Sequence, residues 1–124
     1  MQTDIHRLNV AALALLLAAS STHAETYRTK MTGAQIVQDM LADPLVGANG
    51  VLRERAMGYL DGIMDATAGV SWCPARKAVP HELNYAVAEE MKALGADRLK
   101  GSAAPLVVAA LSKFYPCAVA GRSS

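Results

Sequence analysis

Apolar residues recur at helical spacing in four stretches of the chain. The first begins at Thr32, where Thr32 and Gln35 stand three residues apart and predict a capping box, and it ends at Asp43 and Pro44. Its apolar face consists of Ile36, Val37, Met40 and Leu41. The other three stretches cover residues 51–68, 80–94 and 105–115.

The stretch 51–68 carries two glycines, Gly58 and Gly62, one helical turn apart. Each glycine costs about 1 kcal/mol relative to alanine inside a helix. We therefore expect a packing reason, namely the close approach of another helix across a shallow groove. Gly69 directly follows the stretch and predicts a left-handed helix stop.

The stretch 80–94 opens with Pro80 and has Glu82 in its first turn, and both residue types are favoured at these positions. Its predicted apolar stripe is Leu83, Ala86, Val87, Met91 and Leu94. Gly95 predicts its end.

The last stretch, 105–115, is apolar nearly all round, with Ser112 and Lys113 as its polar exceptions. A helix of this kind needs burial on nearly all sides, either as the central helix of the fold or under a second subunit. The sequence shows no alternating strand pattern. It therefore predicts an all-α fold, a compact bundle of about four helices.

The N-terminus has the pattern of a secretory signal peptide. An almost wholly apolar run, residues 8–19, follows Arg7 and precedes small residues that end at Ala24. The run is shorter than the roughly 20 residues that a membrane-spanning helix needs. We expect residues 1–24 to be removed and residues 25–124 to form one helical domain of 100 residues.

Export places the two cysteines, Cys73 and Cys117, in an oxidising compartment where pairing is the usual outcome. Closing the loop between them stabilises the fold by roughly 4 kcal/mol on the chain-entropy account. The alternatives are a redox site, which favours Cys-X-X-Cys spacing, and a metal site, which needs about four ligands. A structural disulfide is the better interpretation.

Charge gives no reason to expect nucleic acid or an anionic membrane as a partner. The formal net charge is +1, and the basic residues are scattered singly or in pairs. After signal cleavage the chain keeps one histidine, His81, which leaves little basis for a histidine-containing metal site or a catalytic triad. We expect no metal and no other cofactor.

Two aspartates, Asp61 and Asp65, lie four residues apart and therefore share a helix face. They suit either an acid–base pair, or half a cation site, or simply two solvated or arginine-paired carboxylates. The last is favoured, because most helical carboxylate pairs are surface features. The hypothesis of an enzyme is correspondingly weak.

A small helical domain with charged loops is suited to binding another macromolecule, and arginine and aromatic residues are common anchors of protein interfaces. Trp72 either covers the disulfide or anchors a partner. The predicted partner-binding residues are Trp72, Arg76, Lys77, Asp97, Arg98 and Lys100.

Several motifs of the chain resemble the Rap/Tai family of type VI secretion immunity proteins. These motifs are Gly58-Tyr59-Leu60-x-Gly62-Ile63-x-Asp65-Ala66, Cys73 followed by Val79, Leu83 and Val87, Ala104-Pro105-Leu106-Val107, Ala110-Leu111, and Phe114-Tyr115-Pro116-Cys117. The resemblance implies an all-α fold, a disulfide between the positions of Cys73 and Cys117, and frequently a homodimer.

The resemblance also implies a function. The protein would be a periplasmic immunity protein that binds and blocks a peptidoglycan amidase effector, and would not itself be an enzyme. The alternative hypotheses are a small periplasmic chaperone or stress-response protein, and an enzyme that uses Asp61 and Asp65.

Overall fold

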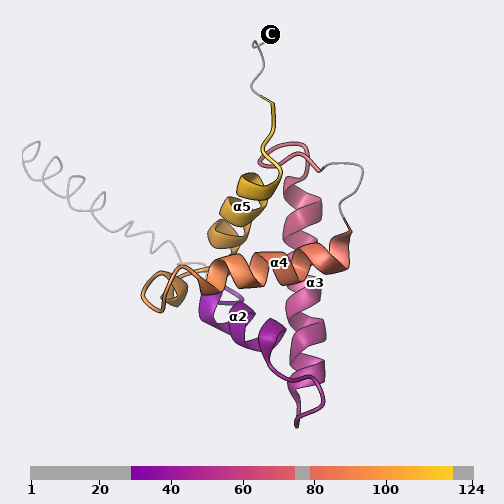
Figure 1. The fold of residues 1–124 in the computed structure, drawn as a ribbon, viewed down its shortest axis with the longest axis vertical. Coiled ribbons are helices and arrows are strands. Elements are labelled where there is room, and N and C mark those ends of the chain that lie inside the picture. The colour runs from indigo at the N-terminus through magenta and orange to yellow at the C-terminus, as the bar shows by residue number, and fades with distance from the viewer. Residues whose placement is uncertain (1–28, 75–78, 119–124) are drawn as a thin grey trace, which may run out of the picture.

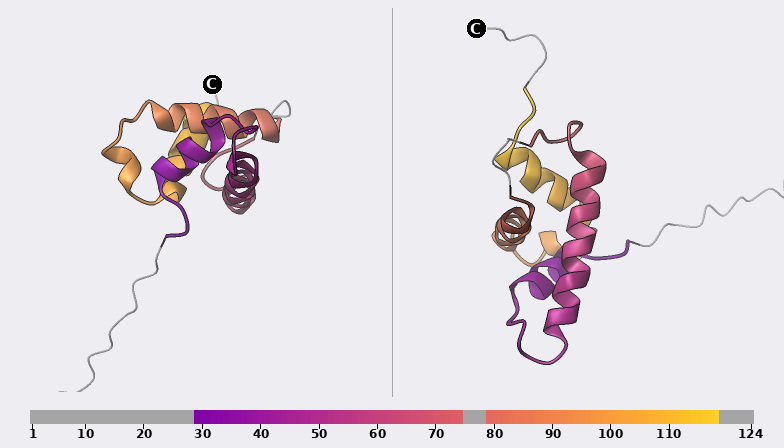
Figure 2. Two further views of the ribbon diagram at one scale, coloured as in Figure 1. Left: turned by 90° about the horizontal axis from the view of Figure 1, so that it is seen from below. Right: turned by 90° about the vertical axis from the view of Figure 1, so that its right-hand side faces the viewer.

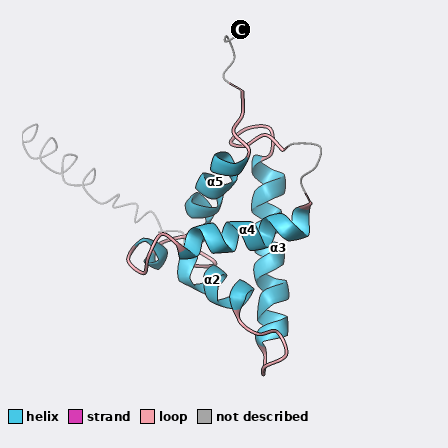
Figure 3. Cartoon of the chain, in the orientation of Figure 1, coloured by secondary structure: helices cyan, strands magenta, loops and turns pink. Residues whose placement is uncertain are grey.

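Four α-helices and one short 3₁₀ turn make up the described part of the chain. The computed structural model describes residues 29–74 and 79–118. The elements in order are α2 (Gly33–Leu41), α3 (Asn49–Thr67), α4 (Pro80–Lys92), η1 (Arg98–Lys100) and α5 (Ala103–Phe114). The described residues contain helices, turns and isolated bridges but no strand (Figure 3), which confirms the predicted all-α fold.

The long helix α3 forms one side of the molecule. Figure 1 shows α4 crossing α3, with α5 and α2 on either side of the crossing. In the right-hand view of Figure 2, α2, α4 and α5 all lie on the same side of α3. No described helix lies against the opposite side of α3. Among the described residues, no helix is long and apolar enough to cross a membrane.

The helix ends follow the predicted local signals. Thr32 caps α2, its side chain accepting a hydrogen bond from the Gln35 backbone while the Gln35 side chain accepts one from the Thr32 backbone. Gly69 and Gly95 have positive φ angles of 75° and 85° and close α3 and the turn after α4. Pro80 occupies the first position of α4.

The core lies where α2, α4 and α5 meet the inner face of α3. Its largest fully buried side chains are Ile36, Met40, Leu60, Asn84, Val87, Met91, Val107 and Leu111. Two predicted stripe residues of α4, Ala86 and Leu94, are exposed, and Asn84 and Ala88 are buried in their place. The stripe on α4 is therefore rotated relative to the prediction.

Helix α5 differs from the prediction in two ways. It begins at Ala103 rather than near Pro105, and only one face of it is buried, formed by Ala103, Val107, Ala110 and Leu111. It packs against α2, α3 and α4, while Ala109 and Lys113 are exposed. The apolar composition of this helix did not predict which of its positions are buried, because small residues such as alanine occur both in the core and at the surface.

Both ends of α5 are fastened to other elements. At its start, the Ala103 backbone N–H donates to the Met31 carbonyl at 3.0 Å, and the Gly33 N–H donates to the Gly101 carbonyl at 3.1 Å. Beyond its end, Cys117 is disulfide-bonded to Cys73 with a Cα–Cα distance of 4.7 Å, which confirms the predicted pairing. The Cys73 N–H also donates to the Tyr115 carbonyl at 2.8 Å.

Within a single copy of the chain, no described helix packs against Gly58 or Gly62, so the neighbouring helix expected there is not one of the same copy. Both are exposed on the outer side of α3, and an added Cβ at either would meet no atom within 4 Å. The glycine that does permit a close approach is Gly33. A Cβ there would lie 2.8 Å from Leu106 Cδ1 and 3.2 Å from the Leu99 Cα.

These two environments predict opposite effects of the same substitution. Gly58→Ala should raise the free energy of unfolding by about 0.5–1 kcal/mol, because the helix gains alanine propensity without a clash. Gly33→Ala should lower it by about 1–3 kcal/mol, because the Leu99 backbone must move. Chemical denaturation of both variants checks this, and a stabilised Gly33→Ala protein would contradict the packing.

The disulfide is expected to contribute to the free energy of unfolding. Replacing both Cys73 and Cys117 by serine should lower the free energy of unfolding by about 2–4 kcal/mol, because the unfolded chain regains the freedom of a long loop. Thermal melts with and without a reductant provide the control. The reductant should lower the melting temperature of the native sequence and leave that of the double variant unchanged.

Candidate functional site

The charged residues predicted to contact a partner gather on η1 as far as the structure describes them. Asp97 and Lys100 form an ion pair with an Nζ–Oδ1 distance of 2.6 Å, and both side chains are exposed. Leu99, between Arg98 and Lys100, is buried and fixes the turn to the core. The charges of η1 are thus held outward, and an exposed pair of this kind adds at most about 1 kcal/mol to stability. Arg76 and Lys77 lie outside the described residues.

Trp72 lies in the core beside the disulfide. It is 4% exposed, its Nε1 donates a hydrogen bond to Thr67 Oγ1 at 3.1 Å, and its ring centre lies 6.1 Å from that of Tyr115. The side chain thus has its polar atom satisfied and a tilted aromatic neighbour. A partner-binding role for Trp72 stays a prediction, and in this conformation the residue presents almost no surface.

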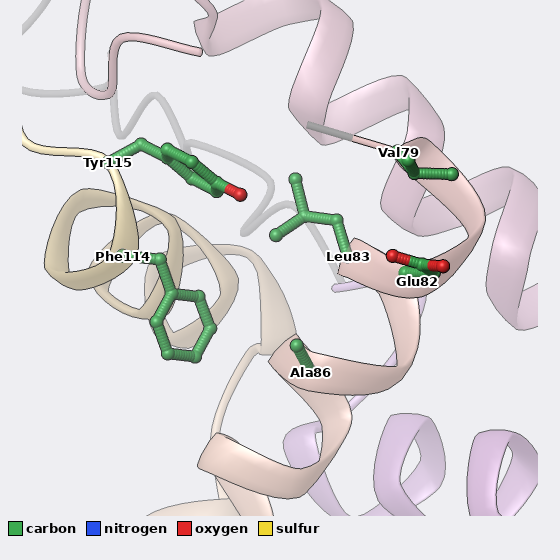
Figure 4. A pocket seen from close by; sticks show the side chains of 6 residues that line it. All are labelled: Val79, Glu82, Leu83, Ala86, Phe114 and Tyr115. Atoms are coloured by element: carbon green, nitrogen blue, oxygen red, sulfur yellow. The ribbon is translucent and has the colours of Figure 1, made fainter. Parts of the chain in front are cut away.

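A shallow groove with a mixed apolar and polar lining lies between the start of α4 and the end of α5. It has a volume of about 410 Å³ and is lined by Val79, Glu82, Leu83, Ala86, Phe114 and Tyr115. In Figure 4 the rings of Phe114 and Tyr115 face Leu83 and Ala86 across the groove, with Glu82 at its edge. The groove can accept an apolar group, but one carboxylate beside it does not make a reactive centre.

The two suspected aspartates border a second pocket of about 370 Å³, which is lined mainly by apolar groups that include Met64, Trp72 and Leu83. They have different environments. Asp61 Oδ1 accepts a hydrogen bond from the Nδ2 of Asn84 at 2.9 Å, and Asn84 is 1% exposed. Asp65 is exposed. The Asp61 carboxylate therefore acts as the hydrogen-bond acceptor of the buried Asn84 amide.

The remaining titratable groups give no indication of a metal centre or a reactive base. His81 is exposed, and its ring stands edge-on to that of Tyr85 with centres 5.1 Å apart. Within residues 29–74 and 79–118, no three histidine, cysteine or acidic side chains come together in a way that could hold a metal ion.

Sequence reasoning missed a group of exposed apolar residues that includes Leu45, the most exposed large apolar residue in the described part of the chain. We call the segment from Asp43 to Val51, which links α2 to the first turn of α3, the α2–α3 tip. It presents Leu45, Val46 and Val51 to solvent with exposed fractions of 91%, 59% and 75%. The sequence contained one signal for this group: Leu45 and Val46 are adjacent apolar residues in a short connector that has no helical periodicity. Exposed apolar clusters of this kind often mark protein-binding sites.

The environments of Asp61 and Asp65 predict different costs for their removal. Asp61→Ala should lower the free energy of unfolding by about 1–3 kcal/mol, because the buried Asn84 amide loses its hydrogen-bond acceptor. Asp65→Ala should change it by less than about 0.5 kcal/mol, because Asp65, exposed like Asp61, has no hydrogen-bond partner among the described residues. Denaturant titrations measure both, and equal effects of the two substitutions would contradict the assignment of Asp61 as a structural acceptor.

Comparison with known proteins agrees with the resemblance found in the sequence. Residues 32–117 match the family of Rap1a immunity proteins. No curated protein matches the chain. The matched region includes all four described helices, both cysteines and the residues of η1. The chain therefore belongs to the Rap1a immunity protein family.

Proposed function

We propose that this protein is a periplasmic immunity protein that binds and inhibits a peptidoglycan amidase effector of a type VI secretion system. The observation that carries the proposal is the family match over residues 32–117, which extends from the cap of the first described helix to the second cysteine. Immunity within this family means protection against an effector. An effector protein is accordingly the partner to seek.

The geometry supports an action by binding rather than by catalysis. Of the two carboxylates that share a helix face, Asp61 holds a buried amide and Asp65 stands in solvent. The grooves on the described surface are shallow and are lined by both apolar and polar groups, as is usual for sites of protein contact. Inhibition by contact needs only a surface that covers the catalytic cleft of the effector.

The periplasm is proposed as the compartment of this protein because the substrate of an amidase effector lies there. Peptidoglycan is outside the cytoplasmic membrane, so an inhibitor that spares the cell's own wall must be exported. The predicted signal peptide, residues 1–24, supplies export, and the disulfide suits an oxidising environment.

For the contact surface, the exposed charges of Asp97, Arg98 and Lys100 remain candidates, as do Arg76 and Lys77 in the loop before α4. A homodimer is part of the proposal. The outer side of α3 leaves room for a second copy, because no described helix covers it.

The proposal predicts binding and protection. Purified protein should bind the secreted amidase encoded beside its gene with a nanomolar dissociation constant, measured by calorimetry, and should abolish hydrolysis of peptidoglycan in stoichiometric amount. Expressed in a sensitive strain, the full chain should protect cells from amidase delivered to the periplasm.

A chain without residues 1–24 is the matched control. It should bind and inhibit the purified amidase equally well and yet fail to protect cells, because it stays in the cytoplasm. Absence of binding to any such amidase would refute the proposal, and full protection by the leaderless chain would refute the periplasmic site of action.

A further inference from the structure

We propose that the α2–α3 tip is the element that this protein inserts into an apolar recess of its effector. The inference rests on the proposed function, since it names the surface through which the effector is bound. It assigns that role to Leu45, Val46 and Val51, whereas the sequence directed attention to charged loops at other places in the fold.

Exposure is the first argument. Leu45 and Val46 are 91% and 59% exposed, and Val51, at the start of α3, is 75% exposed. They are close together in the chain, and no described element packs over them. Single exposed apolar residues are common, but a group that protrudes from one end of a protein more often serves an interface.

A set of local hydrogen bonds defines the course of the backbone in the tip. Asp43 Oδ1 accepts from the Leu45 N–H at 2.9 Å, and the Asp43 carbonyl accepts from Asn49 Nδ2 at 2.9 Å. The Asn49 N–H donates to the Val46 carbonyl at 3.1 Å. Gly47 turns the chain with a φ of 53°, which favours glycine.

These local hydrogen bonds favour binding. A segment already fixed in its exposed form loses little conformational entropy when a partner covers it, so more of the contact free energy appears as affinity. An exposed apolar loop with no such bonds would rather turn its side chains back toward its own core. Here the side chains of Asp43 and Asn49 form hydrogen bonds within the segment that carries Leu45 and Val46.

The surroundings of the tip resemble the rim of an interface. Glu54 and Arg55, on the next turn of α3, are exposed and carry opposite charges. Arg53 donates a hydrogen bond to the Ala42 carbonyl at the end of α2. An apolar centre bordered by charges of both signs is the usual composition of a protein-binding patch.

The size of the tip points to a concave partner rather than to a second copy of this chain. An aromatic side chain buries about 150–250 Å², so three smaller aliphatic side chains offer at most about 450 Å². A stable interface needs about 800 Å² from each partner. A tip-to-tip dimer would fall short, but a recess that surrounds the tip would also contact its polar flanks and reach the required area. An enzyme cleft has that shape.

The test uses a double variant, Leu45→Ser with Val46→Ser, in the full mature chain. Both side chains are exposed, so the melting temperature should stay within about 2 °C of the native value, as expected for surface substitutions. The dissociation constant for the amidase encoded beside the gene should rise at least about tenfold, as for loss of an apolar interface anchor.

Val70→Ser is the matched control, because Val70 is equally apolar, is 81% exposed and lies in the turn at the opposite end of α3. It should leave the dissociation constant within about twofold. Light scattering of all three proteins should give one and the same oligomeric state.

Three outcomes would overturn the inference while the proposed function stood: native-like amidase binding by the double variant, an equal loss of binding in Val70→Ser, or a change of oligomeric state in the double variant, which would make the tip a self-association surface. If the native protein itself fails to bind the amidase, the proposed function and this inference fall together.

Discussion

The double attachment of α5 is the constraint on which the rest of this small fold depends. Its start is hydrogen-bonded to the segment that leads into α2, and its end is joined to the connector after α3 by the disulfide and by a backbone hydrogen bond. The four described helices offer a limited apolar core, and in a domain of this size a covalent link is a substantial part of the total stability. The two attachments fix α5 against α2 and α3, and α4 closes the remaining side of the core.

The local signals in the sequence were sufficient to place the helices but not to orient them. Thr32 with Gln35, Pro80, Gly69 and Gly95 each act through the backbone of their own turn, and each was correctly interpreted. Which face of a helix is buried depends on partners far away in the chain. Asn84 was not expected in the core because its acceptor, Asp61, lies on another helix. Gly58 and Gly62 have the spacing of a packing groove, yet the other helices lie on the far side of α3.

The candidate site was harder to predict than the fold for a related reason. Reactive and charged side chains are the usual signals of function in a sequence, and here they point to Asp97, Arg98 and Lys100 and to the pair of Asp61 and Asp65. The α2–α3 tip contains neither, and its apolar residues would ordinarily be assigned to a core. Their exposure accompanies hydrogen bonds of Asp43 and Asn49 that shape the connector. That bonding pattern is not readable from composition or periodicity, since both residues are frequent in ordinary turns.

The attachment of α5 has a consequence for how the protein is made. The first described helix obtains partners for its leading backbone from the segment just before the last helix, and the single covalent crosslink needs a cysteine close to the C-terminus. Contacts between the two ends of a chain can form only after nearly all of it has emerged from the ribosome. The attachments of α5 therefore form late in synthesis, whereas α2, α3 and α4 can meet one another before α5 has been made. The docking of α5 and the closure of the disulfide are therefore the steps that complete the fold.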